Sequence, residues 1–231
     1  EKTTPQKSDA PQHDSQDAAG ESSEDEQRNP LLTEITVIAM GRLGGAENGF
    51  GSDADVMFVH RPVESADEKE AQAQANRIVN RLMQLIKQPV RPAIRAERPL
   101  EVDADLRPEG KQGAMVRSLD SYRAYYERWA ETWEFQALLR ARPIAGSEEL
   151  GRAFIELIDP YRYPREFTVE QAQQVRRMKA RVEHERMPHG ADRTRQLKLG
   201  RGGLSDVEWL VQLIQLQHAH EVEGLRTTST L

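Results

Sequence analysis

The sequence of 231 residues contains no cysteine, which excludes disulfides and thiolate metal sites and gives no sign of secretion. No apolar run approaches the ~20 residues that a membrane-spanning helix needs. A signal peptide is also lacking. We therefore expect a cytoplasmic protein with no membrane partner. Since the chain starts without Met in linker-like sequence, we expect a piece of a longer protein.

The first thirty residues have little from which a core could form. Glu1–Pro30 lacks Val, Ile, Leu, Phe, Trp and Tyr, so burial cannot offset the entropy of ordering it. We predict a disordered acidic linker. Its three basic and eight acidic residues carry −5 of the net charge of −6, which leaves −1 for Leu31–Leu231. A nearly neutral folded part argues against a nucleic-acid partner bound by a broad basic face.

What the chain does contain is a short run of strand patterns followed by helical ones. Glu34–Met40 is rich in β-branched residues and predicts a buried strand. Gly41–Ser52 is too rich in glycine for a regular element. The patterns that follow predict strands at Asp53–His60 and Leu100–Leu106, a turn at Arg107–Gly113, and helices at Ala66–Lys87, Ser118–Trp129, Thr132–Arg142, Glu148–Ile158, Thr168–Arg186 and Leu204–His220. This order favours an α+β domain at residues 31–145 and a helical domain at residues 146–231, with a bundle cut short at the chain end.

Paired carboxylates are the first chemical signal. Residues two apart on a strand share a face, so Asp53 and Asp55 should project side by side. Their mutual repulsion would be relieved by a hard divalent cation such as Mg²⁺, which prefers oxygen ligands and accompanies phosphates. Asp103 and Asp105 repeat the alternation on the next predicted strand, and a third carboxylate would complete a site for two metal ions. The alternative is that these aspartates face water or cap turns.

The loop before this pair is the second signal. Gly41, Gly44 and Gly45 lie in a segment that ends at Ser52. Backbone N–H groups can approach a phosphate closely where side chains are absent, and Ser52 adds a hydroxyl. The spacing matches neither a Walker loop nor a dinucleotide fingerprint, and a plain tight turn is about as good an interpretation.

Several segments, taken together, resemble one enzyme family. A-M-G-R-L-G-G-A-E-N-G-F-G-S-D-A-D-V-M-F-V at residues 39–59 is similar to the nucleotidyltransferase signature of the glutamine synthetase adenylyltransferase family. V-D-A-D-L-R-P at 102–108, T-W-E-F-Q-A-L-L-R-A-R at 132–142, M-K-A-R at 178–181 and K-L-G-R-G-G-L-S-D-V-E-W at 198–209 follow in the family's order. The resemblance implies a DNA polymerase β-like fold.

The resemblance also implies an activity. Family enzymes transfer AMP from ATP to a tyrosine hydroxyl of glutamine synthetase and release pyrophosphate, with two Mg²⁺ ions expected. A second, similar half removes AMP by phosphorolysis. A PII-type signalling protein and glutamine regulate the full-length protein as part of nitrogen metabolism. The segments at 132–142 and 198–209 resemble the transferring, C-terminal half. Two alternatives remain: the removing half, and a nucleotide-sensing module without catalysis.

Carried over by position, the resemblance implies that Asp53, Asp55 and Asp103 are the catalytic, metal-binding aspartates. Gly41, Gly44, Gly45 and Ser52 match the nucleotide loop, and Arg107 matches the arginine after the third-aspartate strand. Two positions depart from the family pattern: Ala39 replaces a glycine, and Asp105 replaces an arginine. The second leaves it open whether Asp103 or Asp105 binds metal, although the family position favours Asp103.

Features outside these motifs receive structural interpretations. We interpret Trp129, Trp133 and Trp209 as packing residues. Gly200–Gly203 should break the chain before a helix capped by Ser205 or Asp206. A role for Asp206 and Glu208 near a nucleotide is the less favoured interpretation, and Arg140 and Arg142 either reach a phosphate or flank the core helix.

Overall fold

A computed structural model describes residues 30–88, 100–192 and 194–230 of the chain. By its internal contacts the chain divides into two units, Glu1–Pro30 and Leu31–Leu231. Every described helix and strand belongs to the second unit. The predicted linker at Glu1–Pro30 lies almost entirely outside the described residues. None of the described helices has the length and apolar character that a membrane crossing requires.

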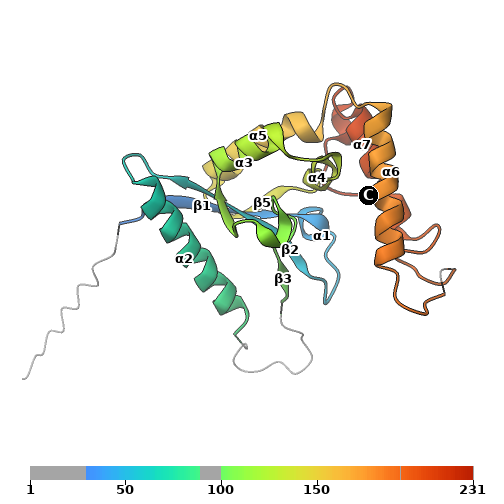
Figure 1. The fold of residues 1–231 in the computed structure, drawn as a ribbon, viewed down its shortest axis with the longest axis horizontal. Coiled ribbons are helices and arrows are strands. Elements are labelled where there is room, and N and C mark those ends of the chain that lie inside the picture. Colours follow the sequence, from blue (N-terminus) through green and yellow to red (C-terminus); the bar gives the residue numbers. More distant parts are fainter. Residues whose placement is uncertain (1–29, 89–99, 193, 231) are drawn as a thin grey trace, which may run out of the picture. The chain divides into compact units, whose positions relative to one another are not determined.

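A mixed five-stranded sheet lies between the helices of the unit (Figure 1). The two long strands, β1 (Thr33–Ala39) and β2 (Ala54–Pro62), pair antiparallel, with Ala39 opposite Val56. On its other side β1 pairs antiparallel with β5 (Arg142–Gly146). The free edge of β2 pairs in parallel with β3 (Val102–Asp103) near its start and with β4 (Val116–Ser118) further along.

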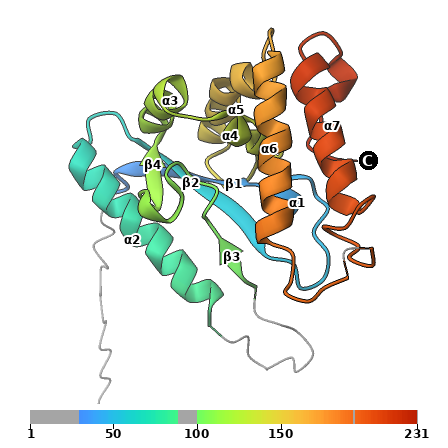
Figure 2. The ribbon, with the colours of Figure 1, turned by 45° about the vertical axis from the view of Figure 1, so that its right-hand side comes forward.

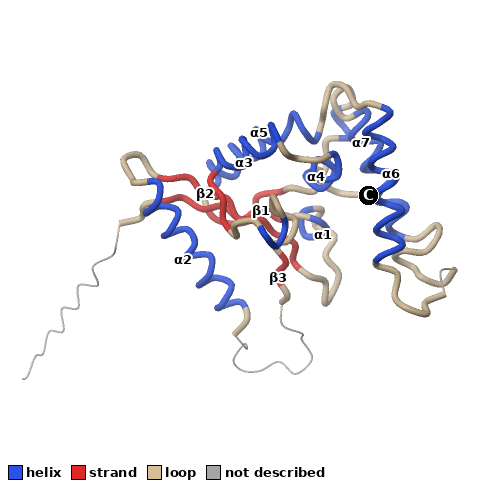
Figure 3. Tube along the Cα trace, viewed as in Figure 1, coloured by secondary structure: helices blue, strands red, loops and turns tan. Residues whose placement is uncertain are grey.

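Helices cover both faces of this sheet, because β2 is apolar on both sides. Val56 and Phe58 pack against one face of α2 (Glu68–Ile86). Met57 and Val59 point the other way, into a cluster with α3 (Leu119–Arg128) and α5 (Glu148–Arg162). Figure 3 shows α2 on one side of the strands and α3 and α5 on the other. The α+β class predicted from the sequence is confirmed.

The remaining helices form a second packed group. α4 (Thr132–Leu138) packs against α6 (Val169–Glu185) and α7 (Leu204–His218), and a third apolar cluster contains Leu139 and Leu216. Figure 2 shows α6 and α7 side by side, beyond the end of the sheet where β2 begins. Lys179 of α6 forms an ion pair with Asp206 of α7, which fixes the two helices to each other. The predicted domain limits at residues 31–145 and 146–231 stay a prediction.

The predicted strand Leu100–Leu106 is wrong in length, because only Val102–Asp103 pairs with β2. The carboxylate of Asp103 accepts a hydrogen bond from the backbone N–H of Asp105, at 2.7 Å, and this local bond turns the chain away from the sheet. The expected alternation of Asp103 and Asp105 on one strand is therefore wrong.

Three further predictions from the sequence also needed correction. The glycine-rich segment contains a short helix, α1 (Gly41–Gly44), where no regular element was expected. The helix predicted at Thr132–Arg142 ends at Leu138, because Arg142 already pairs with β1 as part of β5. Neither β4 nor β5 was predicted. Of the three tryptophans interpreted as packing residues, Trp129 is largely exposed.

Candidate functional site

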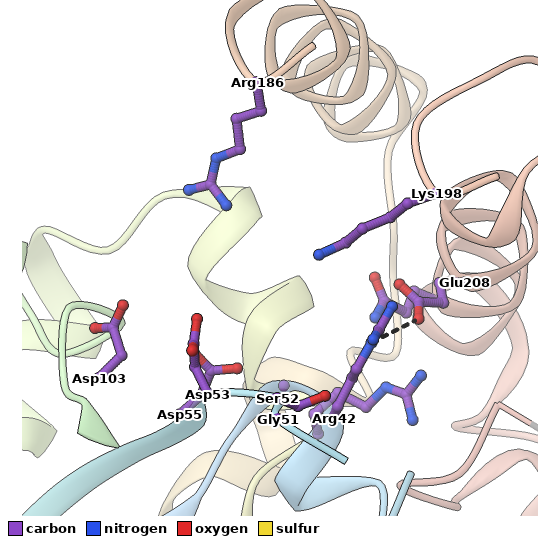
Figure 4. Close-up of a pocket in the computed structure, with 12 residues that line it drawn as sticks. Arg42, Gly51, Ser52, Asp53, Asp55, Asp103, Arg186, Lys198 and Glu208 are labelled. Carbon is purple, nitrogen blue, oxygen red and sulfur yellow. Dashed lines mark ion pairs between the residues drawn. The ribbon is translucent and has the colours of Figure 1, made fainter. Parts of the chain in front are cut away.

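A cavity of about 480 Å³ opens where β2 begins, between the sheet and the α6–α7 group. Asp53, Asp55 and Asp103 line it together (Figure 4). Asp55 lies directly opposite Asp103 in the parallel pairing of β2 with β3, and Asp53 precedes it by two residues on the same face. The sheet thus brings the three predicted aspartates to one wall of one cavity.

The electrostatics of this wall are those of crowded carboxylates. Burial raises the pKa of the half-buried Asp55, and the neighbouring charges of Asp103 and Asp53 raise it further. Two cations on the opposite side, Lys198 and Arg186, act in the other direction. The three carboxylates outnumber the two cations that face them, so this part of the cavity favours ligands that bring positive charge.

The glycine loop approaches this wall through Gly41. Its backbone has φ +50°, which is unfavourable for any residue with a side chain, and a Cβ there would clash with Oδ2 of Asp55. Gly41 and Ser52 line the cavity. Gly44 and Gly45 lie behind the cavity, where a Cβ on either would clash with Arg140.

Arg107 has a different environment from the predicted phosphate contact. Its side chain is 7% exposed, and its guanidinium donates to the carbonyls of Ala104 at 2.7 Å and Gly113 at 3.1 Å. It also forms an ion pair with Asp105 at 3.5 Å. The guanidinium therefore holds the turn after β3, outside the residues that line the cavity.

The same turn contains the two cations that pair with the carboxylate of Asp105. Besides Arg107, this carboxylate pairs with Lys111 at 3.3 Å. It is absent from the cavity lining, whereas Asp103 is part of it. Of the two aspartates left open by the sequence, the geometry places Asp103 beside Asp55.

The far wall of the cavity consists of residues that the sequence did not single out as a group. Arg186 directly follows the last residue of α6, and Lys198 lies in the segment between α6 and α7. Both side chains point toward the aspartates in Figure 4. Lys198 is held in place because its carbonyl accepts the backbone N–H of Ser205 at 3.0 Å. No periodic pattern marks either cation, because only the tertiary fold brings them opposite the sheet.

Arg42 and Glu208 close one end of the cavity. Arg42 of α1 and Glu208 of α7 form an ion pair at 3.9 Å, drawn as the dashed line in Figure 4. Arg140, also in the lining, is buried and pairs with Glu47 at 3.1 Å. Glu208 near the site was the less favoured interpretation of the sequence, yet it lies in the lining.

The donor set is made of oxygen atoms. Carboxylates at this wall are hard ligands of the kind that Mg²⁺ prefers. In the described residues, no group of three or more His, Cys, Asp or Glu side chains is arranged so that these side chains could hold a metal ion. Mg²⁺ is in general held by one or two carboxylates together with substrate phosphates rather than by a closed protein cage.

Comparison with known proteins places this chain among adenylyltransferases. A sequence profile described as glutamate-ammonia ligase adenylyltransferase matches residues 8–157, and one described as PII-uridylyltransferase matches residues 176–231. The chain is 58% identical over 201 residues to a protein of Streptomyces avermitilis, 55% over 201 residues to one of Corynebacterium glutamicum, and 52% over 208 residues to one of Mycobacterium bovis.

All three relatives are named bifunctional glutamine synthetase adenylyltransferase/adenylyl-removing enzyme. The alignments cover 87%, 87% and 90% of this chain, but 20%, 19% and 20% of the relatives from Streptomyces, Corynebacterium and Mycobacterium. The chain thus spans about a fifth of the length of the curated relatives it matches.

Proposed function

The chain belongs to the glutamate-ammonia ligase adenylyltransferase family of nucleotidyltransferase enzymes, and on this premise we propose that it transfers AMP from ATP to a tyrosine hydroxyl of glutamine synthetase. The observation that carries the proposal is the meeting of Asp53, Asp55 and Asp103 in one cavity. The family relation supports glutamine synthetase as the protein substrate. Regulation by a PII-type protein and glutamine is proposed for the full-length protein.

The residues present fit Mg²⁺. Burial raises the pKa of Asp55 most, and the charges of Asp103 and Asp53 raise it further, so a cation bound here would relieve the repulsion among the three carboxylates. The oxygens of Asp53, Asp55 and Asp103 would hold the two ions expected. When bound, Mg²⁺ supplies the charge that neutralises phosphate oxygens and favours ionisation of the attacking hydroxyl.

Residues of both cavity walls would contact the substrates, each with a different role. The absence of a side chain at Gly41 lets its backbone lie against the carboxylate of Asp55 at the cavity wall, and Ser52 offers a hydroxyl donor. Lys198 and Arg186 face the carboxylates and would bind the pyrophosphate oxygens as their charge grows. Asp103, exposed at the cavity wall, accepts the proton of the incoming tyrosine hydroxyl.

In the reaction the tyrosine oxygen forms a bond to the α-phosphorus, and the bond from that phosphorus to the bridging oxygen of pyrophosphate breaks. The proton of the hydroxyl goes to Asp103, and pyrophosphate leaves with the electrons of the broken bond. Arg107 is proposed as an indirect contributor, because it holds the turn that places Asp103.

We propose the transferring half and a DNA polymerase β-like fold. The mixed sheet with helices on both faces and aspartates beside a short helix is compatible with that fold. The Gln136 and Ser205–Asp206 positions carry the resemblance to the transferring half. The removing half is the alternative, because the relatives are named as bifunctional.

Two incubations separate these functions. In the first, the chain, Mg²⁺, ATP labelled at the α-phosphate and unmodified glutamine synthetase should give labelled synthetase and pyrophosphate. In the second, adenylylated synthetase and inorganic phosphate should give no ADP. ADP formation in the second would identify the removing half, and no reaction in either would favour the non-catalytic alternative.

A further inference from the structure

A second cavity, of about 720 Å³, lies beside the carboxylate cavity. Arg186, Lys198, Glu208 and Gln212 line both, so the two spaces are neighbours that share one wall. The volume is in the range of pockets that hold small organic ligands, about 300–1,000 Å³. A ligand long enough to occupy both cavities would pass Arg186 and Lys198 at their boundary.

The second cavity differs from the first in its lining. Side chains from α4, α6 and α7 give it apolar and aromatic surface, including Trp133, Met178 and Trp209. Both tryptophans are only partly buried, so their indole rings retain surface that a ligand can cover. Flat aromatic ligands gain from burial against such rings. This space therefore suits a planar heterocycle, whereas the carboxylate cavity suits phosphates and metal ions.

Two buried polar atoms in this lining have no hydrogen-bond partner among the described residues. The side chain of Gln136 is 3% exposed; its Nε2 donates to Oε1 of Gln212 at 2.7 Å, while its own Oε1 is unpaired. Ser205, 7% exposed, has an unpaired Oγ. A buried polar atom without a partner is costly, and most native proteins avoid it.

Ser205 is unpaired for a local reason. It was predicted from the sequence as a possible cap of the last helix, but α7 begins after Gly203, whose residue type has no side chain to cap with. Asp206 instead accepts the backbone N–H of Gly202 at 2.7 Å. The hydroxyl of Ser205 therefore does not cap the helix, and Ser205 lines the second cavity.

We propose that the second cavity binds the adenine ring of ATP, with Oε1 of Gln136 accepting a hydrogen bond from the exocyclic amine and Oγ of Ser205 donating to a ring nitrogen. This rests on the proposed function. Adenine presents an amine donor next to a ring acceptor, whereas guanine and hypoxanthine present a carbonyl oxygen at the same place. A carbonyl would face the carbonyl oxygen of Gln136, so the site rejects 6-oxopurines.

The proposal also orders the substrate across the two cavities. The base lies among the α4, α6 and α7 side chains, and the triphosphate reaches past Lys198 and Arg186 to the aspartates. Gln212 lines both cavities. Its Oε1 accepts the hydrogen bond from Nε2 of Gln136, which holds the Gln136 side chain in place. Base selection is therefore a property of the helical group alone, whereas the phosphates lie between the cations of that group and the aspartates of the sheet.

Equilibrium binding tests the assignment without any transfer reaction. The whole chain, with Mg²⁺ present, is titrated with ATP, with ITP, whose base carries a 6-oxo group, and with inorganic tripolyphosphate. We expect ATP to bind at least about tenfold more tightly than ITP. In Gln136→Met the two should bind within about threefold of each other, while tripolyphosphate affinity stays unchanged. Gln173→Met, at an exposed position of α6, is the matched control and should keep the preference.

Ser205→Ala removes one hydroxyl and should weaken ATP about three- to tenfold without changing tripolyphosphate affinity. It keeps the test decisive if Gln136→Met does not fold. Equal affinities for ATP and ITP in the unchanged chain overturn the proposal. So does an ATP preference that survives in folded Gln136→Met, or ATP affinity that Ser205→Ala leaves intact.

These outcomes are distinct from failure of the proposed function. ATP and tripolyphosphate binding without base preference would remove only the adenine site. Base-selective ATP binding without labelling of glutamine synthetase would remove the transfer reaction and leave the adenine site standing. Binding of neither ATP nor tripolyphosphate would contradict both.

Discussion

The two walls of the carboxylate cavity are built in different ways. Asp55 and Asp103 come from paired strands and Asp53 directly precedes one of them, so backbone hydrogen bonds and the core beneath β2 fix their positions. Arg186 and Lys198 come from the end of one helix and the segment that follows it. The acidic wall depends on the pairing of β2 with β3, while the basic wall depends on how α6 and α7 pack. We infer that the sheet fixes where the chemistry happens and that the helical group adjusts the charge facing it.

The largest expected effect is on the acidic wall. Asp53→Asn and Asp55→Asn should each lower AMP transfer by at least about 100- to 1000-fold, because neither amide can replace a carboxylate toward Mg²⁺. Circular dichroism should show an unchanged fold, since Asp53 is exposed and Asp55 is half-buried. Asp105→Asn, which alters only the pairs with Arg107 and Lys111, is the control and should keep most activity. Near-normal transfer by Asp55→Asn would remove the assigned role of the acidic wall.

Gly41→Ala should come next. The added methyl would clash with Oδ2 of Asp55, and φ +50° is strained for alanine, so both the carboxylate and the loop must move. We expect a tenfold or greater loss of transfer and a loss of about 1–2 kcal/mol in unfolding free energy. Gly190→Ala is a useful control, since it has φ +76° but meets nothing within 4 Å, and it should show the backbone strain alone. An active Gly41→Ala variant would mean that the loop need not approach Asp55 so closely.

The basic wall should tolerate change better. Lys198→Ala and Arg186→Ala should each weaken ATP binding by about three- to thirtyfold, since each removes one cation facing the phosphates. The effect should shrink as salt is added, because the cavity is open to solvent. Arg177→Ala, on an exposed part of α6, should leave ATP affinity unchanged. Losses as large as those of the aspartate variants would show that both walls are equally essential.

The smallest effect concerns the core behind the site. His60 is buried between Oγ1 of Thr33 at 3.0 Å and Oε1 of Gln72 at 2.9 Å, and burial lowers its pKa below 6.5. The unfolded chain therefore binds a proton at His60 before the folded chain does. Stability should fall as pH drops below about 6.5 toward the lowered folded-state pKa.

Thermal unfolding at a series of pH values checks this behaviour. His60→Gln cannot take up the proton, so its unfolding temperature should fall less steeply with acid than that of the unchanged chain. Comparing the two chains isolates His60 from other groups, such as Glu134, whose pKa burial raises. Parallel curves for the two chains would show that His60 does not contribute to acid sensitivity.

Elements that depend on nearby residues could be predicted from the sequence, whereas those that depend on residues far away in the chain could not. β1, β2 and α2 carry enough periodic apolar residues to be recognised, and the alternation on β2 is what placed Asp53 beside Asp55. β3 was predicted within a longer strand at Leu100–Leu106, and only two of those residues pair. β4 is three residues long, too short for a pattern to show. β5 contains Pro143 and ends at Gly146, which disguise an edge strand that exists because β1 offers it partners.

The site divides in the same way. Asp103 was assigned through family resemblance, and the pairing of Asp55 with Asp103 that explains it is a property of the folded sheet. Lys198 and Arg186 could not be assigned from periodicity, because their relation to the aspartates spans more than 80 residues of chain. The unpaired Ser205 was missed for a simpler reason: a serine near a helix start predicts a cap, and Gly203 already occupies that position.

The most direct test of the acidic wall is to count the metal ions it holds. Mn²⁺, a spectroscopic substitute for Mg²⁺, can be titrated into the chain together with an ATP analogue that cannot be cleaved, and bound ions counted by electron paramagnetic resonance. We predict two bound ions per chain, lost or greatly weakened in Asp55→Asn and retained in Asp105→Asn. Equal Mn²⁺ binding by the unchanged chain and by Asp55→Asn would contradict the assignment of this cavity as the metal–nucleotide site.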